Sequence, residues 1–258
     1  MQTLIYDGRF AGLLSAIFDV YYYKFTEVDI CQEKSFNGNI FTTPHIVHTS
    51  NSKSQRVWKG LEQKLCDTAQ QQLHRTFLSE LPGIENVFLR YVQYAFTSPV
   101  SIEQDFSNDA VLTITQTAKT VWREMHRMQA FVRFQKTADD LYYAIIEPDF
   151  NVLPLLTEHF ENRYADQRWM IYDARRKYGI YYNLKSVTEV QIYFNPQSSN
   201  GKNVRSVYDE SEALYQQLWQ QYFKSINIKA RKNTKLHIQH MPVRYWKYLP
   251  EKRESSLI

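Results

Sequence analysis

Apolar residues recur three or four positions apart over several stretches of the chain, which is the spacing of an amphipathic helix. In the first stretch Phe10, Leu13, Leu14, Ile17 and Phe18 fall on one side. Capping residues and helix-breaking Pro or Gly mark most of the ends. The pattern predicts helices over about 10–24, 50–65, 67–81, 84–96, 109–129, 151–160 and 209–223.

Shorter stretches alternate between apolar and polar residues or are rich in β-branched and aromatic residues, as strands are. Asp139 and Asp140 form a turn between two of these stretches, which predicts a hairpin. The segments after residue 168 form a predicted antiparallel meander, whereas Cys31–Pro44 contains mixed turn residues. The predicted strands are about 3–6, 41–49, 130–136, 141–146, 168–173, 178–183 and 187–194.

Strand and helix do not alternate along the second half in the way that a parallel sheet requires. The sequence therefore predicts an α+β fold, in which an antiparallel sheet (hairpin plus meander) packs with several helices, and the N-terminal half is mostly helical. With 258 residues, the chain is expected to form a single domain, 1–258, with a possible subdivision near 98–108. A flexible loop is predicted over about 195–205, where Ser, Asn and Gly accumulate.

Positive charge is concentrated near the C-terminus. The formal net charge is only +4, but residues 224–254 contain nine Lys or Arg and two Glu. The rest of the chain is therefore net acidic. A basic segment on a nearly neutral body predicts a polyanionic partner.

A second basic feature lies on the predicted helix 109–129, where Lys119, Arg123 and Arg127 are four residues apart and share one face. Like charges at this spacing repel each other by about a few tenths of a kcal/mol per pair. Glu124 lies next to them and is expected to neutralise only part of this stripe. The face is either solvated or directed at phosphates, which would offset the repulsion.

Basic and aromatic residues alternate in the C-terminal segment, as in surfaces that follow a phosphate backbone and stack bases. The alternative is a C-terminal lid, anchored to the core by Trp246 and Tyr248, whose lysines extend into solvent. The two interpretations are compatible. Besides the helical stripe, the candidate nucleic-acid contacts are Arg133, Arg175, Arg176, Arg231, Lys232, Arg244, Tyr245, Trp246 and Lys247.

Glu147 and Asp149 form a carboxylate pair at the end of a predicted strand, where catalytic or metal-binding groups often lie. Turn and cap chemistry explains this pair equally well. Asp7 and His126 join them as weak catalytic candidates if folding gathers all four in one cleft. Asp7 is also placed to cap the helix that starts near Phe10.

No cofactor or metal is predicted. The chain lacks GxGxxG, GxxxxGK[ST], HExxH and GxSxG, and its 7 Gly argue against a glycine-rich phosphate cradle. Cys31 and Cys66 have neither CxxC spacing nor a nearby His pair, so neither a disulfide framework nor a zinc site is supported. The sequence shows no signal peptide and no membrane-spanning apolar run, so a cytoplasmic protein without membrane contact is expected.

Four segments together resemble a known bacterial family. They are YDGRFAGLLSAIFDVYYYK, REMHRMQAFVRF, IIEPDFNVLPLLTEHFENRYADQRWMIYD and MPVRYWKYLPE, and they follow one another over nearly the whole chain. The family is domain of unknown function 4130, associated with DNA repair or DNA metabolism. Its members are encoded beside a radical-SAM DNA-modification protein or fused to a uracil-DNA glycosylase-like domain. The resemblance implies a DNA context but brings no established reaction and no catalytic residue.

Three functions are compatible with these patterns. The first is a DNA-binding accessory protein in DNA repair or modification, whose partners are DNA and the separately encoded radical-SAM protein. The chain has no CxxxCxxC and is therefore not itself the radical-SAM component. The alternatives are a DNA-processing enzyme, such as a nuclease or a base-processing activity with a carboxylate cleft, and a protein–protein adaptor. Whether the protein is an enzyme stays open at this stage.

Overall fold

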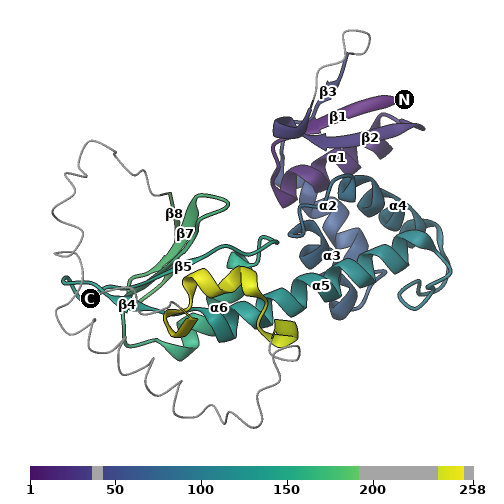
Figure 1. The fold of residues 1–258 in the computed structure, drawn as a ribbon. Helices are drawn as coiled ribbons and strands as arrows, with labels where there is room; N and C mark the ends of the chain where they lie inside the picture. Colours follow the sequence, from purple (N-terminus) through teal and green to yellow (C-terminus); the bar gives the residue numbers. More distant parts are fainter. Residues whose placement is uncertain (37–42, 192–237, 253–258) are drawn as a thin grey trace. The chain divides into compact units, whose positions relative to one another are not determined.

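The computed structural model describes residues 1–36, 43–191 and 238–252 (Figure 1). Two compact units, Met1–Trp122 and Arg123–Ile258, divide the chain, and their boundary falls within helix α5 (Asp109–Phe131). The loop expected over 195–205 and the helix expected over 209–223 lie outside the described residues.

The sheet of the first unit is parallel. Strands β1 (Gln2–Tyr6), β2 (Val28–Gln32) and β3 (His45–Ile46) lie in the order β2-β1-β3, and helix α1 (Phe10–Tyr22) connects β1 to β2. The expected antiparallel arrangement is therefore wrong for this sheet. Strand β2 was not predicted, because only Ile30 in it is fully buried and its alternating pattern is short. Its last two residues fall in the stretch that was assigned to turns.

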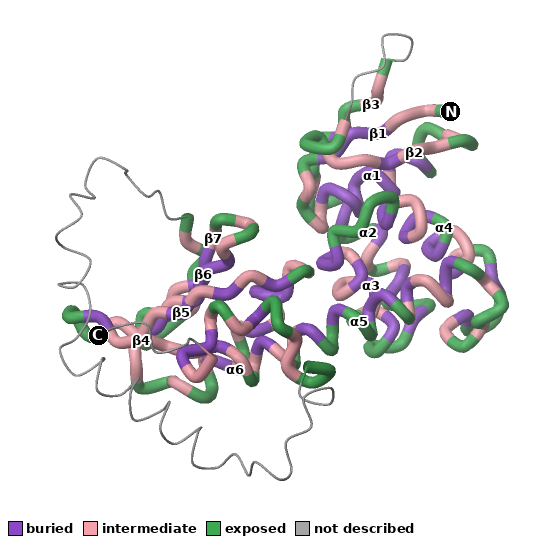
Figure 2. The backbone as a smooth tube through the Cα atoms, viewed as in Figure 1, coloured by how far each residue is buried: buried purple, intermediate pink, exposed green. Residues whose placement is uncertain are grey.

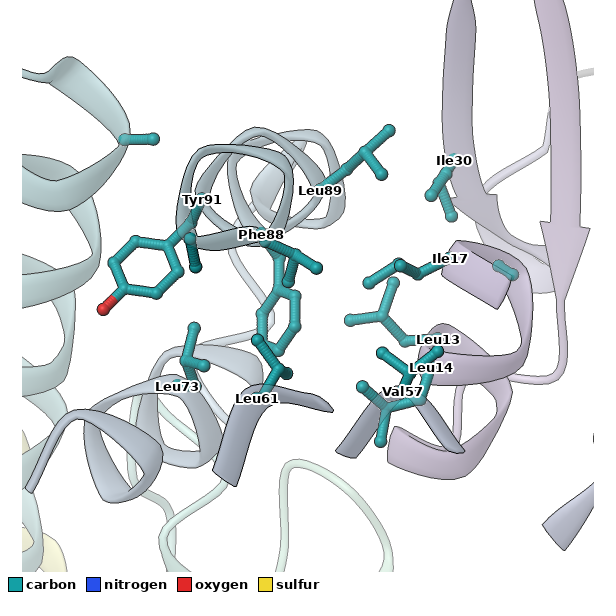
Figure 3. Packing of buried hydrophobic residues seen from close by; sticks show 14 of the residues in the cluster. Leu13, Leu14, Ile17, Ile30, Val57, Leu61, Leu73, Phe88, Leu89 and Tyr91 are labelled. Carbon is teal, nitrogen blue, oxygen red and sulfur yellow. The ribbon is translucent and has the colours of Figure 1, made fainter. Parts of the chain in front are cut away.

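Helices build most of the first unit, as the spacing of apolar residues predicts. Leu13 and Ile17 of α1 pack with Leu61 and Leu73, and Phe88 fills the space between them (Figure 3). Burial of these side chains is the main favourable term in folding of the unit. The helices are α2 (Asn51–Glu62), α3 (Asp67–Phe77), α4 (Ile84–Thr97) and the first part of α5, with the short 3-10 helix η1 (Glu33–Ser35) after β2.

The sheet of the second unit is mixed. Its strands are β4 (Gln135–Lys136), β5 (Tyr142–Ile146), β6 (Trp169–Asp173), β7 (Tyr178–Tyr182) and β8 (Val187–Val190), in the order β4-β5-β6-β7-β8. The antiparallel hairpin β4–β5 and the antiparallel meander β6–β7–β8 confirm two parts of the prediction. Strands β5 and β6 are parallel, however, because helix α6 (Leu153–Arg163) returns the chain to the end of the sheet at which β5 begins.

The junction between α5 and the sheet also differs from the prediction. Residues 130–136 were expected to be extended, but α5 continues to Phe131, and the N–H of Val132 still bonds the carbonyl of Met128 at 3.0 Å. This is the i to i−4 bond of an α-helix. The strand that remains, β4, is only two residues long, and Arg133 lies between the helix and β4.

Aromatic rings fill the core of the second unit. Trp169 is completely buried and stacks on Tyr182 at 5.5 Å between centroids, while Phe160 of α6 contacts it at 6.1 Å. Figure 2 shows buried residues on α6 and on the neighbouring strands. Two short 3-10 helices, η5 (Val243–Tyr248) and η6 (Pro250–Lys252), complete the described part of this unit.

Candidate functional site

The carboxyl ends of β5 and β6 bring two polar segments together. These strands are parallel, and their register ends with Ile146 opposite Asp173. Glu147 and Asp149 follow β5 at this edge, and the basic turn 174–177 follows β6. Ligand sites of parallel sheets commonly lie beyond the carboxyl ends of the strands. This edge is therefore the candidate functional site of the second unit.

Asp173 organises the turn after β6. Its buried carboxylate accepts the backbone N–H groups of Arg175 and Arg176 at 2.9 and 3.1 Å, and it pairs with the Arg176 guanidinium at 3.0 Å. The same guanidinium donates to the carbonyl oxygens of Pro148 at 3.2 Å and of Asp149 at 2.9 Å. Arg176 thus ties the two strand ends together, and its side chain is only 11% exposed.

Glu124 of α5 is the buried acid beside these strand ends, with a side chain that is 1% exposed. Its two oxygens accept the backbone N–H groups of Asp149 at 2.9 Å and of Phe150 at 3.1 Å. The Tyr245 hydroxyl donates to it at 2.6 Å, and an Arg244 nitrogen lies 3.5 Å away. A buried carboxylate is costly unless it is paired and hydrogen-bonded, and these four groups meet that requirement.

Helix η5 docks on this edge through Arg244 and Tyr245 (yellow in Figure 1). Arg244 pairs with the Asp149 carboxylate at 3.0 Å, and its guanidinium lies 4.5 Å from the centroid of the Tyr245 ring. The Tyr245 ring is buried at 2% exposure and contacts Phe131 at 5.7 Å. Burial and the bond to Glu124 raise the pKa of Tyr245. This residue is therefore placed as an anchor and not as an exposed stacking surface.

Glu147 accepts hydrogen bonds from two further residues of η5. Lys247 and Tyr248 both donate to the same oxygen of its carboxylate. The bond from Lys247, followed by that from Tyr248, lowers the pKa of Glu147. Lys247 therefore already has an anionic partner within its own unit.

The remaining contacts extend the docking of the C-terminal segment. Arg133 pairs at 2.8 Å with Glu251, whose side chain is completely buried. The indole N–H of Trp246 donates to the carbonyl of Met241 at 3.0 Å, and the Lys252 ammonium lies 4.9 Å from its ring. Of the two anchors that the lid interpretation names, Tyr248 bonds Glu147 and Trp246 bonds Met241 of the segment itself, while Tyr245 is the ring that is buried. The other two C-terminal candidates, Arg231 and Lys232, lie outside the described residues.

The basic residues of α5 behave differently. Arg123 is exposed and Arg127 is half-buried, and within the described part of the chain neither forms an ion pair. Lys119 is also exposed, on the part of α5 that belongs to the first unit. Glu124, expected to neutralise part of this stripe, turns inward instead and binds η5. Arg175 is exposed, with 55% of its side chain accessible, but its guanidinium also lies 3.6 Å from the Asp149 carboxylate.

The four weak catalytic candidates are not gathered in the described structure of one unit. Glu147 and Asp149 share the strand edge, whereas His126 is exposed on α5 and lies 3.0 Å from the Gln129 side-chain oxygen. Asp7 belongs to the first unit, where its carboxylate accepts the N–H of Arg9 at 3.0 Å. Asp7 does not cap α1, because Arg9 is the N-cap residue and no side-chain bond caps the helix.

Two acids of this site were not predicted. Glu124 lies three residues after Val121 and four before Met128, and both of these are buried. This spacing places Glu124 on the inner side of the helix and could have identified it. Asp173 ends a predicted strand, but nothing in the sequence alone shows that it is buried.

The described residues contain no group of three or more His, Cys, Asp or Glu side chains that could hold a metal ion. Within the same ranges, no helix combines the length and the apolar character needed to cross a membrane. The site presents acids that accept hydrogen bonds from donors of the same unit.

Comparison with known proteins places these features in a family. A model of a domain of unknown function, DUF4130, matches residues 82–251. The match includes α4, α5, the mixed sheet and the η5 residues that bind Glu124 and Glu147. No curated protein matches the chain. Because the family model covers well over half of the sequence, the chain belongs to the DUF4130 family.

Proposed function

We propose that this protein is a DNA-binding accessory protein in DNA repair or modification that acts beside a separately encoded radical-SAM protein. The resemblance of four sequence segments to a family with a DNA context supports the biological setting. The observation that carries the binding proposal is the state of Arg123 and Arg127, which have no acidic partner among the described residues. Their mutual repulsion on α5 would be offset by a phosphate.

Four other candidate cations are less suited to bind phosphate, which leaves the α5 arginines as the better candidates. Arg133, Arg176, Arg244 and Lys247 each bind a carboxylate of their own unit, so their charge is already compensated. Moving Arg133, Arg176 or Arg244 to a phosphate would leave Glu251, Asp173 or Glu124, respectively, buried without this counter-charge, which is costly. Among the described candidates of the second unit, the proposed contacts with DNA are therefore Arg123 and Arg127, supplemented by Arg175, whose side chain is 55% exposed.

Fluorescence anisotropy with labelled DNA tests this surface. Wild-type protein should bind with an affinity that falls steeply between about 50 and 200 mM salt. The double variant Arg123→Gln/Arg127→Gln should bind about tenfold or more weakly, since two phosphate contacts are lost. The matched control Arg163→Gln/Lys185→Gln removes two exposed charges elsewhere in the unit and should bind like wild type.

Two results would contradict the binding proposal. One is an absence of binding by wild-type protein at low salt. The other is equal affinity for the α5 variant and the control variant. Partnership with the radical-SAM protein has its own test, which is co-purification of the two proteins without DNA, and failure to form a complex would remove only that part.

A DNA-processing enzyme is the second candidate. The observation that favours it is the position of Glu147 and Asp149 together beyond the carboxyl ends of parallel strands, next to Lys247 and Arg244. Incubation with damaged and undamaged oligonucleotides, with and without Mg²⁺, separates the two functions. A cleaved or altered strand that disappears with Glu147→Gln would support an enzyme, whereas an accessory protein leaves every substrate intact.

A further inference from the structure

An exposed group of aromatic rings lies at the C-terminal end of α1 in the first unit. Three consecutive tyrosines are 45%, 68% and 50% exposed, at positions Tyr21, Tyr22 and Tyr23. The opposite side of the helix, with Leu13 and Ile17, points into the core of the unit (Figure 3). These tyrosines are therefore not part of the core pattern that makes α1 amphipathic.

The rings form two stacked pairs. Tyr22 stacks on Phe18 with 5.9 Å between centroids and 18° between planes, and Tyr23 stacks on Phe25 at 5.6 Å and 25°. The two tyrosines meet edge to face at 4.9 Å and 88°. Each pair thus ends in a ring that is at least half exposed and is held in a fixed orientation by a ring behind it.

Cations surround this aromatic cluster. Arg56 is exposed, and its guanidinium lies 5.7 Å from the centroid of the Phe18 ring, while the Lys53 ammonium lies 5.9 Å from the same ring. Lys24 is exposed directly after the third tyrosine. Asp19 is buried and binds Lys53 and His45, while the exposed Glu27 lies 3.6 Å from the N-terminal ammonium.

His45 closes the cluster from β3. Its ring contacts Tyr23 at 5.2 Å and Phe25 at 5.6 Å, both edge to face, and its Nε2 lies 3.0 Å from an Asp19 oxygen. Asp19 also accepts from Lys53 at 2.7 Å. The buried carboxylate therefore holds His45 and Lys53, which lie against rings of the cluster.

We propose that this aromatic cluster, Phe18, Tyr22, Tyr23 and Phe25 with its cations Lys24 and Arg56, binds single-stranded DNA by stacking unpaired bases on Tyr22 and Tyr23. Pre-oriented, half-exposed rings beside unpaired cations are the composition of surfaces that hold single strands. Bases within a duplex have no free face to offer, so the cluster is selective for unpaired DNA. This inference rests on the proposed DNA-binding function and adds a strand preference and a second contact surface.

A protein partner is the competing occupant, and charge favours DNA. Exposed Lys24 and Arg56 flank the rings, and among the described residues neither forms an ion pair, so the surface offers an anion both a cation and a flat apolar face. The tyrosines and Arg56 fit either occupant, but Lys24 favours DNA, because protein interfaces are depleted of lysine at their centres. The cluster is therefore better matched to a strand with alternating phosphates and bases.

Anisotropy with the full chain and labelled oligothymidylate tests the cluster. Tyr22→Ala/Tyr23→Ala should bind single strands about tenfold or more weakly than wild type, with unchanged affinity for duplex DNA. Tyr22→Phe/Tyr23→Phe keeps the rings and should bind single strands like wild type. Phe106→Ala, which removes another ring of the same unit that is 51% exposed, serves as the matched control and should change nothing. Photocrosslinking with 5-iodouracil in the oligonucleotide should label Tyr22 or Tyr23.

Several results would overturn the inference, and they are distinguishable from failure of the proposed function. If wild-type protein binds DNA and the α5 arginine variant loses this binding, but Tyr22→Ala/Tyr23→Ala binds single strands normally, the cluster is not a DNA site. The same holds if this variant alters only self-association in sedimentation, which would indicate a protein contact. If wild-type protein binds no DNA, the proposed function fails and this inference fails with it. Circular dichroism confirms that each variant is folded.

Discussion

Glu124 shows how one residue determines which cations remain for a ligand. It lies inside the second unit and accepts hydrogen bonds from the strand end, through Asp149 and Phe150, and from η5, through Tyr245. Because Arg244 is held between this carboxylate and that of Asp149, it is committed to the unit's own acids. Arg123 and Arg127 of α5 flank the same residue in sequence but lack such a partner among the described residues.

Replacement of this acid should destabilise the unit. In Glu124→Gln one amide oxygen can accept one of the two backbone N–H groups, but the amide NH₂ would face the other donor. The unpaired buried donors should cost about 1–3 kcal/mol. The free energy of unfolding, measured in urea, checks this, with Glu158→Gln on the exposed side of α6 as control, where a change within about 0.5 kcal/mol is expected. Equal stability of both variants would show that Glu124 does not anchor the segment.

The bond network of Glu147 predicts a pH dependence. Lys247 and Tyr248 lower the pKa of this carboxyl below its ordinary value of 4.5 in the folded chain. The unfolded chain therefore takes up the proton first, and the contribution to stability is present above about pH 4.5 and lost as the pH falls through the lowered folded value. Wild type should melt at a higher temperature than Glu147→Gln at neutral pH.

The comparison of the two proteins over a pH series isolates this group from the other carboxyls. The difference in melting temperature should narrow as the pH falls from about 4.5 through the lowered folded pKa of Glu147, because the protonated carboxyl is then uncharged like the Gln side chain. A difference that stays constant down to acid pH would contradict the assignment of this ion pair.

At the scale of elements, local patterns predicted the helices and strands better than they predicted their pairing. Helices α1 to α5 and strands β5 to β7 lie close to the predicted ranges, because apolar spacing reports which side of an element is buried. Strand direction depends on where α6 returns the chain, and no local pattern encodes that. The same limit applies to the site, since Glu147 and Asp149 were identified as candidates, but their partners on η5 are about a hundred residues away.

Substitution of an α5 arginine should have opposite effects on the stability of the fold and on the affinity for DNA. Replacing Arg127 by Gln removes repulsion from Arg123 one turn away, so the folded state should gain about a few tenths of a kcal/mol. The same change removes a proposed phosphate contact and should weaken DNA binding. Urea unfolding and anisotropy on one preparation measure both quantities. A variant that loses stability together with affinity would indicate a structural role for Arg127 and argue against a surface kept free for DNA.

At the scale of the whole molecule, the two units offer different chemistry. The hydrophobic core that contains Leu4, Ile17, Phe88 and Ile114 lies entirely within Met1–Trp122, where the aromatic cluster is found. The carboxylate site lies in the other unit, together with Arg123 and Arg127, which form no ion pair among the described residues, and most of this unit falls within the family match at 82–251. The arginines of the second unit would contribute to binding by charge, whereas the tyrosines of the first unit would contribute by stacking.

Salt dependence separates these two terms. Each phosphate contact contributes about −0.9 to the slope of log K against log salt on duplex DNA and about −0.7 on single strands. Arg123→Gln/Arg127→Gln should therefore reduce the magnitude of the slope by about 1.8 on duplex DNA. Tyr22→Ala/Tyr23→Ala should lower the affinity for single strands at every salt concentration with little change of slope, because stacking releases no counterions. If Tyr22→Ala/Tyr23→Ala changes the slope as much as the arginine variant does, the rings do not stack bases. They would then act by positioning the cations beside them.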